Sequence, residues 1–352
     1  MTENDIYQEL LNMINAQDVV GLPDTPSMKR VLELQFTPEE AELAIKIGLT
    51  GGPLEELAQK LGIDKDQLFE KLNTMADKGT MWIDPGGVAN PNCRVLGSAA
   101  PGLVETGIWG NIRYPHDVEL AKNLHQAVYE WSRDNLCQLG FPFAPVWAHP
   151  WVLPEDAKPE ENLAEFIKDQ GYFSISFCPC RLSHWIAEPG DHCEHMLETC
   201  LHTGETARWC VEHKQGREIT YEEAMGILKR ANADGLVHTI NINGFICNCC
   251  DDCCPMFVGY HKLNTQTLIP SPFIPSVDEN LCIACGDCED ICPMRAVKVE
   301  QIAEIDEAVC IGCGVCVTHC SVGAMALVRR TEQVEVSEEL KQAMDEHGQP
   351  KA

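Results

Sequence analysis

Two cysteine runs near the end of the sequence have the same spacing and constrain the chain more than any other feature. The first run is Cys282-x2-Cys285-x2-Cys288-x3-Cys292, and the second is Cys310-x2-Cys313-x2-Cys316-x3-Cys320. Three cysteines separated by two residues wrap a tight loop around three corners of a cube, and the fourth follows on a helical turn. Eight cysteines in this register do not arise by chance, so the segment is predicted to bind metal.

Each run resembles the motif of bacterial two-cluster ferredoxins, in which the fourth cysteine ligates the other [4Fe-4S] cluster. The resemblance implies one cluster on set A, which is Cys282, Cys285, Cys288 and Cys320, and one on set B, which is Cys310, Cys313, Cys316 and Cys292. Gly286, Gly312 and Gly314 are expected to let backbone amides approach the sulfurs. Ser321 stands where proline is usual, which removes no ligand. Zinc would need two four-cysteine sets without the x3-Cys-Pro ending.

The number of cysteines, twenty, is compatible with disulfides or with metal, and the cellular compartment decides between them. The N-terminal residues are acidic and lack the basic and apolar segments of a secretory signal. No apolar stretch is long enough to predict a membrane span. We therefore expect a cytoplasmic protein whose cysteines bind metal.

The chain is strongly acidic, with 26 Lys and Arg against 54 Asp and Glu and a formal charge of −28. Bound clusters add further negative charge. Such a surface repels nucleic acid and anionic membranes, and it suits docking onto a basic patch of a protein redox partner. The oligomeric state stays open. The apolar fraction of 45% is that of an ordinary globular protein.

Residues 1–95 are predicted to form a helical domain. Thr37, Pro38 and Glu40 carry the signals of a helix start, and two more helices are predicted over 53–62 and 64–78. Their order resembles the helix-turn-helix of winged-helix domains. The helix over 64–78 has no arginine, and its lysines are outnumbered by acidic residues, so DNA binding is disfavoured.

Residues 96–268 are predicted to form a mixed, cysteine-rich domain. We expect an amphipathic helix over 117–137, short helices over 161–169 and 220–233, and strands over 172–177 and 236–246. A proline-rich linker leads to the ferredoxin-like domain, 276–330, and an acidic tail, 331–352. The expected fold class is α+β, with a winged-helix-like domain, a central mixed domain and a two-cluster ferredoxin-like domain.

A second group of cysteines lies in the central region. The candidate metal ligands are Cys178, Cys180, Cys193, Cys200, Cys247, Cys249, Cys250, Cys253 and Cys254. In a helical turn Cys250 would share a face with Cys253 or Cys254, and Cys249 with Cys253, so the run indicates two faces. One or two further [4Fe-4S] clusters are predicted here, with zinc as the alternative because His192 and His195 flank Cys193.

Other residues of the central region leave alternatives open. Arg181 either donates hydrogen bonds to cluster sulfurs or pairs with an acidic residue. Cys210 lies near the candidate ligands in sequence, and the isolated Cys93 and Cys137 are expected in the core. His184 and nearby tryptophans are compatible with an enclosed site.

The whole chain resembles a broad group of 4Fe-4S binding proteins of anaerobes that begin with a winged-helix-like domain, a resemblance that names no reaction. Nucleotide-binding glycine motifs are absent from the sequence. The main hypothesis is a multi-cluster electron-transfer protein or subunit that serves a partner oxidoreductase. The alternative is a reductase with a catalytic cluster in the central region, fed by the ferredoxin-like domain. A redox-sensing regulator is a third hypothesis, against which the acidic helix over 64–78 argues.

Overall fold

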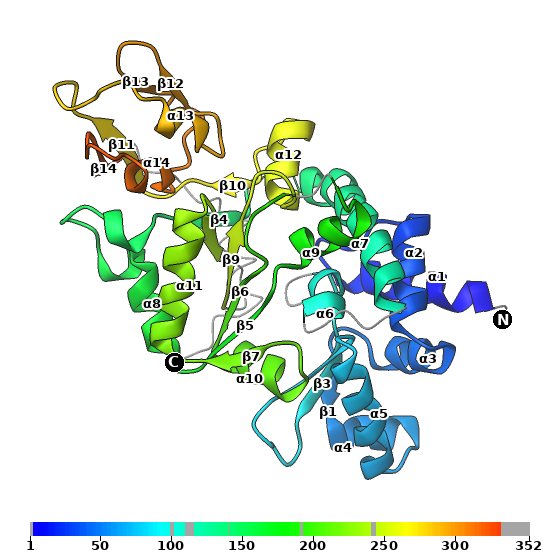
Figure 1. Ribbon diagram of the computed structural model, residues 1–352. Coiled ribbons are helices and arrows are strands. Elements are labelled where there is room, and N and C mark those ends of the chain that lie inside the picture. Colours follow the sequence, from blue (N-terminus) through cyan, green and yellow to red (C-terminus); the bar gives the residue numbers. More distant parts are fainter. Residues whose placement is uncertain are drawn as a thin grey trace.

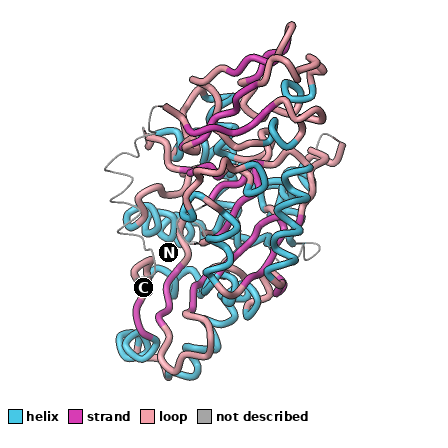
Figure 2. The backbone as a smooth tube through the Cα atoms, turned by 90° about the vertical axis from the view of Figure 1, so that its left-hand side faces the viewer, coloured by secondary structure: helices cyan, strands magenta, loops and turns pink. Residues whose placement is uncertain are grey.

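The computed structural model describes residues 3–98, 102–109, 116–139, 141–190, 193–240 and 244–331. A central sheet is covered by helices on both faces, and a smaller unit projects from one end (Figure 1). Figure 2 shows the same arrangement from a second direction. The predicted acidic tail lies outside the described residues except for its first residue, and so does His192. None of the helices in these ranges is long and apolar enough to cross a membrane.

The N-terminal region combines helices with a small antiparallel sheet of strand order β1-β3-β2. Its helices are α1 (Glu3–Gln17), α2 (Pro26–Gln35), α3 (Pro38–Ile47), α4 (Leu54–Leu61) and α5 (Lys65–Asp77), and its strands are β1 (Gly52–Pro53), β2 (Met81–Ile83) and β3 (Asn92–Val95). The predicted capping box is confirmed, since Thr37 and Glu40 bond each other's backbone amides. Asp64 likewise caps α5. The three predicted helices are present, and the winged-helix resemblance stays a prediction.

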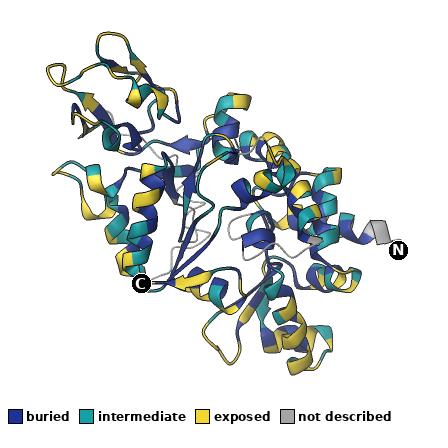
Figure 3. Cartoon of the chain, in the orientation of Figure 1, coloured by how far each residue is buried: buried dark blue, intermediate teal, exposed yellow. Residues whose placement is uncertain are grey.

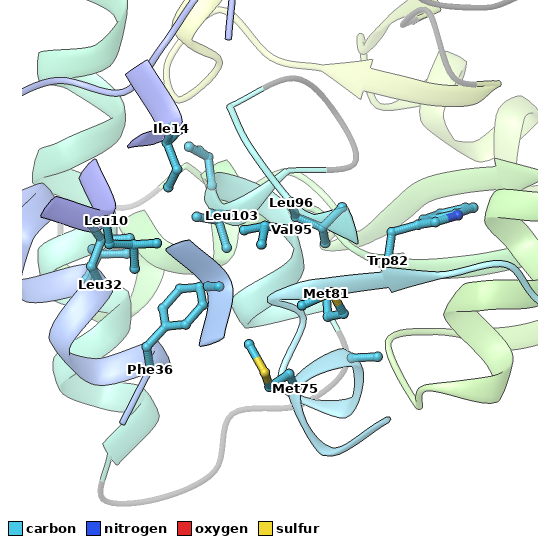
Figure 4. Close-up of a cluster of buried hydrophobic side chains, with 14 of the residues drawn as sticks. Leu10, Ile14, Leu32, Phe36, Met75, Met81, Trp82, Val95, Leu96 and Leu103 are labelled. Atoms are coloured by element: carbon cyan, nitrogen blue, oxygen red, sulfur yellow. The ribbon is translucent and has the colours of Figure 1, made fainter. Parts of the chain in front are cut away.

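The core of the N-terminal region continues past residue 95 into the central region. Figure 4 shows part of it, where side chains of the N-terminal helices meet β2, β3 and Leu103 of α6 (Leu103–Trp109). The same core includes Leu124 and Trp131 of α7 (His116–Asp134), and it reaches Phe245 of the central sheet. A 3-10 turn (Leu136–Gln138) follows α7, so the predicted helix over 117–137 ends earlier than expected.

The central sheet has seven strands in the order β10-β4-β8-β9-β6-β5-β7. The strands are β4 (Ala144–Trp147), β5 (Phe173–Phe177), β6 (Glu198–Thr203), β7 (Arg217–Ile219), β8 (Val237–Ile240), β9 (Phe245–Cys249) and β10 (Leu268–Ile269). All neighbouring strands are antiparallel except β10 and β4. Short 3-10 turns at Pro150–Val152 and Pro159–Glu161 follow β4.

Strand alternation separates the two faces of this sheet. Leu201 and Ile246 pack against α8 (Leu163–Gln170) and α11 (Tyr221–Ala233). Their neighbours Cys200 and Cys247 point to the opposite face and pack with α6, α7 and α9 (Pro179–Ala187). Figure 1 shows these helices on the two sides of the sheet. The central cysteines therefore lie between the sheet and α7 and α9, beside α12 (Pro255–Leu263). Another helix, α10 (Gly204–Glu212), links β6 to β7.

The single strand predicted over 236–246 is wrong. The segment forms two strands, β8 and β9, which pair with each other in antiparallel register from Val237 opposite Cys249 to Ile240 opposite Ile246. Gly244, at φ +72°, directly precedes β9 in a conformation that favours glycine. Strand β9 places Cys247 and Cys249 in the sheet beside β8.

The unit that follows β10 is small and has its own two-stranded sheets. Its elements are β11 (Phe273–Val277), α13 (Asp287–Asp290), β12 (Val297–Val299), β13 (Ala303–Ile305), α14 (Val315–Thr318) and β14 (Met325–Arg329). Strands β11 and β14 pair, as do β12 and β13. Figure 3 shows buried strands in the central sheet and many exposed residues in this unit. The molecule is thus mixed helix and sheet, as α+β requires.

Candidate metal centres

All twenty cysteines lie in the described part of the chain, and none forms a disulfide. In the C-terminal unit the two sets predicted from spacing each surround one small cavity. One cavity is lined by all four cysteines of set A, and the other by all four of set B. Cys320 thus meets the first run, and Cys292 meets the second. The sets are adjacent, because Cys288 of set A and Cys316 of set B are buried in the same small core.

The backbone around the two sets repeats itself. Ala284 and Gly286 have φ values of +51° and +93°, and their counterparts Gly312 and Gly314 have +67° and +81°. The amide of Ala324 donates to Cys320 Sγ at 3.2 Å, and the amide of Ala296 donates to Cys292 Sγ at 3.3 Å. The same amide contact is therefore present at both fourth cysteines, although Cys320 is followed by Ser321 and Cys292 is followed by proline.

Set A faces solvent. Cys285 is exposed, and Ile283 beside it has 63% of its surface exposed. A Cβ placed on Gly286 would meet nothing within 4 Å. The first loop of the repeat is therefore open to solvent and to any protein that approaches it.

Set B faces the rest of the protein. A Cβ on Gly312 would lie 2.1 Å from the carbonyl oxygen of Phe273. The amide of His149 donates to the carbonyl of Cys313 at 3.0 Å. Burial raises the pKa of the Cys313 thiol to about 12, so this thiol keeps its proton at neutral pH until a metal binds. Metal binding must release that proton.

In the central region, four cysteines form a connected chain of thiol contacts, which we call the inner set. The inner set is Cys200, Cys247, Cys249 and Cys254. Cys247 hydrogen-bonds both Cys200 and Cys249, and Cys249 also hydrogen-bonds Cys254. These residues come from β6, from β9 and from the N-terminal cap of α12. All four line a cavity of about 70 Å³.

A second group, the outer set, consists of Cys180, Cys193, Cys250 and Cys253. The sulfurs of Cys193 and Cys253 are 3.3 Å apart, and those of Cys193, Cys250 and Cys253 all lie within 4.8 Å of one another. Cys180 packs against the same small core. Two faces are therefore present, as the sequence indicated, although Cys249 meets Cys254 rather than Cys253 because residues 250–253 form a turn and not a helix.

The remaining cysteines differ from the two sets. Cys178 hydrogen-bonds Cys180 and lines the inner cavity, so it stands between the sets. Cys210 is fully buried on α10, in the same core as Cys93. Cys137 is half-buried and packs against α12, at Gly259. Cys93 and Cys210 therefore lie in the core, as expected for Cys93, whereas Cys137, also expected there, is only half-buried.

Arg181 is the buried cation of this region, with 1% of its surface exposed. It donates to the carbonyl of Met196 at 3.0 Å, to that of Asn248 at 2.8 Å, and to the Thr199 hydroxyl. Burial alone would lower its pKa, but the neighbouring Cys178 and Cys250 sulfurs raise the pKa on balance. The hydrogen bonds named above thus go to backbone carbonyls and a hydroxyl rather than to an acidic residue, and the cysteine sulfurs act on Arg181 through their charge.

In each of the two central sets, one cysteine has a lowered pKa and therefore forms a thiolate more readily. Hydrogen bonds from Cys247 and Cys254 lower the pKa of Cys249, and hydrogen bonds from Cys193 and Cys253 lower the pKa of Cys250. The charge of Arg181 lowers both further. Neighbours in the sequence thus serve different sets, because adjacent residues point in different directions.

Buried titratable groups lie near the inner set. Burial raises the pKa of the Glu105 carboxyl, which lines the same cavity, to about 8. On the neighbouring strands, burial lowers the pKa of His202 of β6 to about 3 and that of His238 of β8, which bonds Asn248, to about 4. The Glu105 carboxyl that lines the inner cavity is therefore mainly protonated at pH 7.

His184 is the residue of this site that spacing did not assign. Its Nδ1 lies 3.0 Å from Cys253 Sγ. Trp151 and Trp185 are more than 40% exposed and do not enclose the site. His195, which flanks Cys193 in the sequence, lies in a bend with its Nδ1 3.3 Å from a carboxylate oxygen of Asp234. The signal for His184 was its place one turn after Cys180 on α9.

Set B and the inner set share one hydrophobic core. That core contains Cys313 together with Cys249 and Cys254, joined by Phe257 of α12 and Ile311. The residues of this core that lie between the two sets are buried or half-buried. The C-terminal unit is therefore packed directly onto the central site through set B.

Residues 281–324 match the family model of the 4Fe-4S dicluster domain. No curated protein and no solved structure matches the chain. The match covers the segment that holds both cysteine runs, so the chain has a ferredoxin-type iron–sulfur domain near its C-terminal end that binds [4Fe-4S] clusters. With the many cysteines, it supports an iron–sulfur electron-transfer role. The central cysteines suggest further clusters.

Proposed function

We propose that this protein carries electrons through four [4Fe-4S] clusters and exchanges them with a protein redox partner. Set A, set B, the inner set and the outer set each hold one cluster. Every set supplies four thiolates, which is the number that a fully ligated cubane takes. Zinc in a central set is the competing occupant, since zinc also takes four thiolates.

The observation that carries this proposal is the hydrophobic core shared by set B and the inner set. A shared packed core keeps two clusters close, which electron transfer between them requires. Cys249 and Cys250 are consecutive, so the inner and outer sets are also neighbours. The sets therefore form a series in the order A, B, inner, outer.

Electrons enter or leave at set A, the exposed end of this series. The exposed apolar residues around it are Leu281, Ile283 and Val322, and the exposed acidic residues are Asp278, Glu279, Asp287 and Asp290. An apolar centre with an acidic rim suits a partner that offers a matching basic rim. The strongly acidic chain fits the same preference.

A second candidate function, a reductase, is favoured by one observation. A cavity of about 410 Å³ opens beside the outer set and is lined by Cys180, Cys193 and Cys253, with His184 and Lys262. This space can admit a small molecule to the last member of the series. The electron-transfer series is the same in both candidates, and the reductase adds a substrate at its end.

Electron paramagnetic resonance of the fully reduced protein tests the series, because neighbouring reduced clusters broaden each other's signals. Replacing Cys313 and Cys316 together by alanine removes the set B cluster. We expect the signals of the set A and inner clusters to become narrower, as each loses its neighbour. The control is Cys137→Ala, outside all four sets. Central signals that do not change when set B is emptied would contradict the series.

A further inference from the structure

A group of nitrogen and oxygen atoms lies on the far side of the outer set. It consists of His125 of α7, His184 of α9 and Glu188 at the end of α9. One ligating atom from each lies within 4.8 Å of the other two. The Nε2 atoms of His125 and His184 are 3.5 Å and 3.7 Å from the carboxylate oxygens of Glu188. The two rings are parallel, with centroids 4.6 Å apart.

The orientation of His184 determines which of its nitrogens can bind a metal. Its Nδ1 is 3.0 Å from Cys253 Sγ. A cysteine sulfur bound to a cluster is a thiolate and only accepts, so Nδ1 carries the proton and donates it. A neutral imidazole then presents the lone pair of Nε2 toward Glu188. Ligating histidines are held in this way, with the second ring nitrogen fixed by a hydrogen bond.

The group is short of positive charge at its centre. The Nε2 lone pair of His184 and the carboxylate of Glu188 both accept, and neither supplies a hydrogen to the other. A proton on both imidazoles would place two like charges in stacked rings 4.6 Å apart. A divalent cation removes the conflict, because it takes all three groups as ligands.

The surroundings leave room for a ligand on such an ion. The three residues line the cavity of about 410 Å³ that also borders Cys193 and Cys253. Two histidines and one glutamate are the protein ligands of catalytic zinc sites, which keep a position open for water or substrate. The same donors with open positions also bind Fe²⁺.

We propose that His125, His184 and Glu188 form a mononuclear site for a divalent transition metal such as Zn²⁺, with open positions facing this cavity. The ion lies one imidazole away from the outer set. It can hold a small oxygen- or nitrogen-donor ligand against that set, with Lys262 of the same cavity favouring a negatively charged one. The protonation assigned to His184 rests on the proposed cluster at the outer set, whereas the grouping of the three ligands and the cavity does not.

Zinc binding to the cluster-loaded full chain tests this proposal. The protein is purified without oxygen, treated with a weak chelator that leaves iron in place, and titrated with Zn²⁺. We expect one zinc per chain. X-ray absorption at the zinc edge should give nitrogen and oxygen neighbours at about 2.0–2.1 Å and no sulfur shell near 2.3 Å. A sulfur shell would overturn the proposal, because zinc would then occupy a cysteine set.

Variants separate this site from the cysteine sets. His125→Ala and Glu188→Ala remove ligands that do not contact a cysteine in the hydrogen bonds described, so both should weaken zinc binding by more than roughly 100-fold with iron content unchanged. The matched control is His195→Ala, because His195 also lies near two carboxylates, Asp251 and Asp252. Unchanged zinc affinity in His125→Ala, or loss of iron from it, would overturn the proposal. A wrong iron count in the parent protein would instead bear on the electron-transfer series.

Discussion

The ferredoxin-type unit and the central region both gather cysteines, but they do so by different means. In the unit, sets A and B come from one short repeat, and local turns bring each set together. In the central region, each set draws on segments far apart in the sequence: the start of α9, a bend at Cys193, β6, β9 and α12. The first arrangement is specified by spacing and the second by the tertiary fold.

The two regions also differ in how they handle charge. Set A meets solvent, which stabilises the charge of a cluster directly. The central sets are enclosed, and their thiolates are offset by the buried guanidinium of Arg181. The set A cluster can therefore be lost at small cost to the rest of the molecule, whereas the central clusters are part of the core.

The largest predicted difference concerns loss of one ligand from each region. Cys285→Ala and Cys249→Ala should each lose one cluster, or about four irons. Only Cys249→Ala should also destabilise the central region, because structural metal sites contribute on the order of 10 kcal/mol to folding. Iron analysis and anaerobic calorimetry measure both effects. Equal unfolding temperatures of the central region in the two variants would break the comparison.

The second prediction tests the buried charge. Arg181→Leu removes the cation that faces the central thiolates and leaves them uncompensated, which should cost about 3–5 kcal/mol. Arg217→Leu is the control, because Arg217 is half exposed and its ion pairs with Glu198 and Glu223 should be worth less than about 1 kcal/mol. Denaturant unfolding of the cluster-loaded proteins gives both values. Similar losses from the two variants would contradict the role of Arg181.

The third prediction uses one glycine from each run of the repeat, Gly286 of the first and Gly312 of the second. Gly286→Ala should cost about 1–2 kcal/mol, since both positions have positive φ values. Gly312→Ala should cost roughly 1–3 kcal/mol more, because its Cβ would overlap the carbonyl of Phe273. The measurement is the rate at which each variant loses visible cluster absorbance on warming. Equal rates would show that set B is as open as set A.

The last prediction is a pH dependence of the central region. The folded pKa of His238, about 4, lies below the usual 6.5 because the ring is buried. The stability that its neutral form contributes is present above pH 6.5 and is lost as the pH falls toward 4, by roughly 3 kcal/mol at most. His238→Gln should flatten that part of the stability curve. An unchanged slope would mean that His238 is hydrated.

The sequence predicted the ferredoxin-type unit well because its information is local. The spacing of two runs was sufficient to group eight cysteines, and the cavities lined by sets A and B agree with that grouping. Helix boundaries at Thr37 and Asp64 were also predictable, because a capping side chain bonds amides only two or three residues away.

The central site could be predicted only as a list of candidates. Which cysteines meet depends on the pairing of β6 with β9 and of β8 with β9. The sequence predicted a single strand over the segment that forms β8 and the start of β9. His184 carries no local signal beyond its spacing from Cys180. His125 meets it through the packing of α7 against α9, which no short motif encodes, whereas Glu188 follows it by four residues at the end of α9.

The iron, acid-labile sulfide and zinc content per chain, measured after purification without oxygen, tests the central claim most directly. Four clusters predict about sixteen irons and sixteen sulfides. Zinc, where present, should then be bound by nitrogen and oxygen. About eight irons and eight sulfides, with zinc bound by sulfur, would contradict the account, because electron transfer would then be confined to the ferredoxin-type unit.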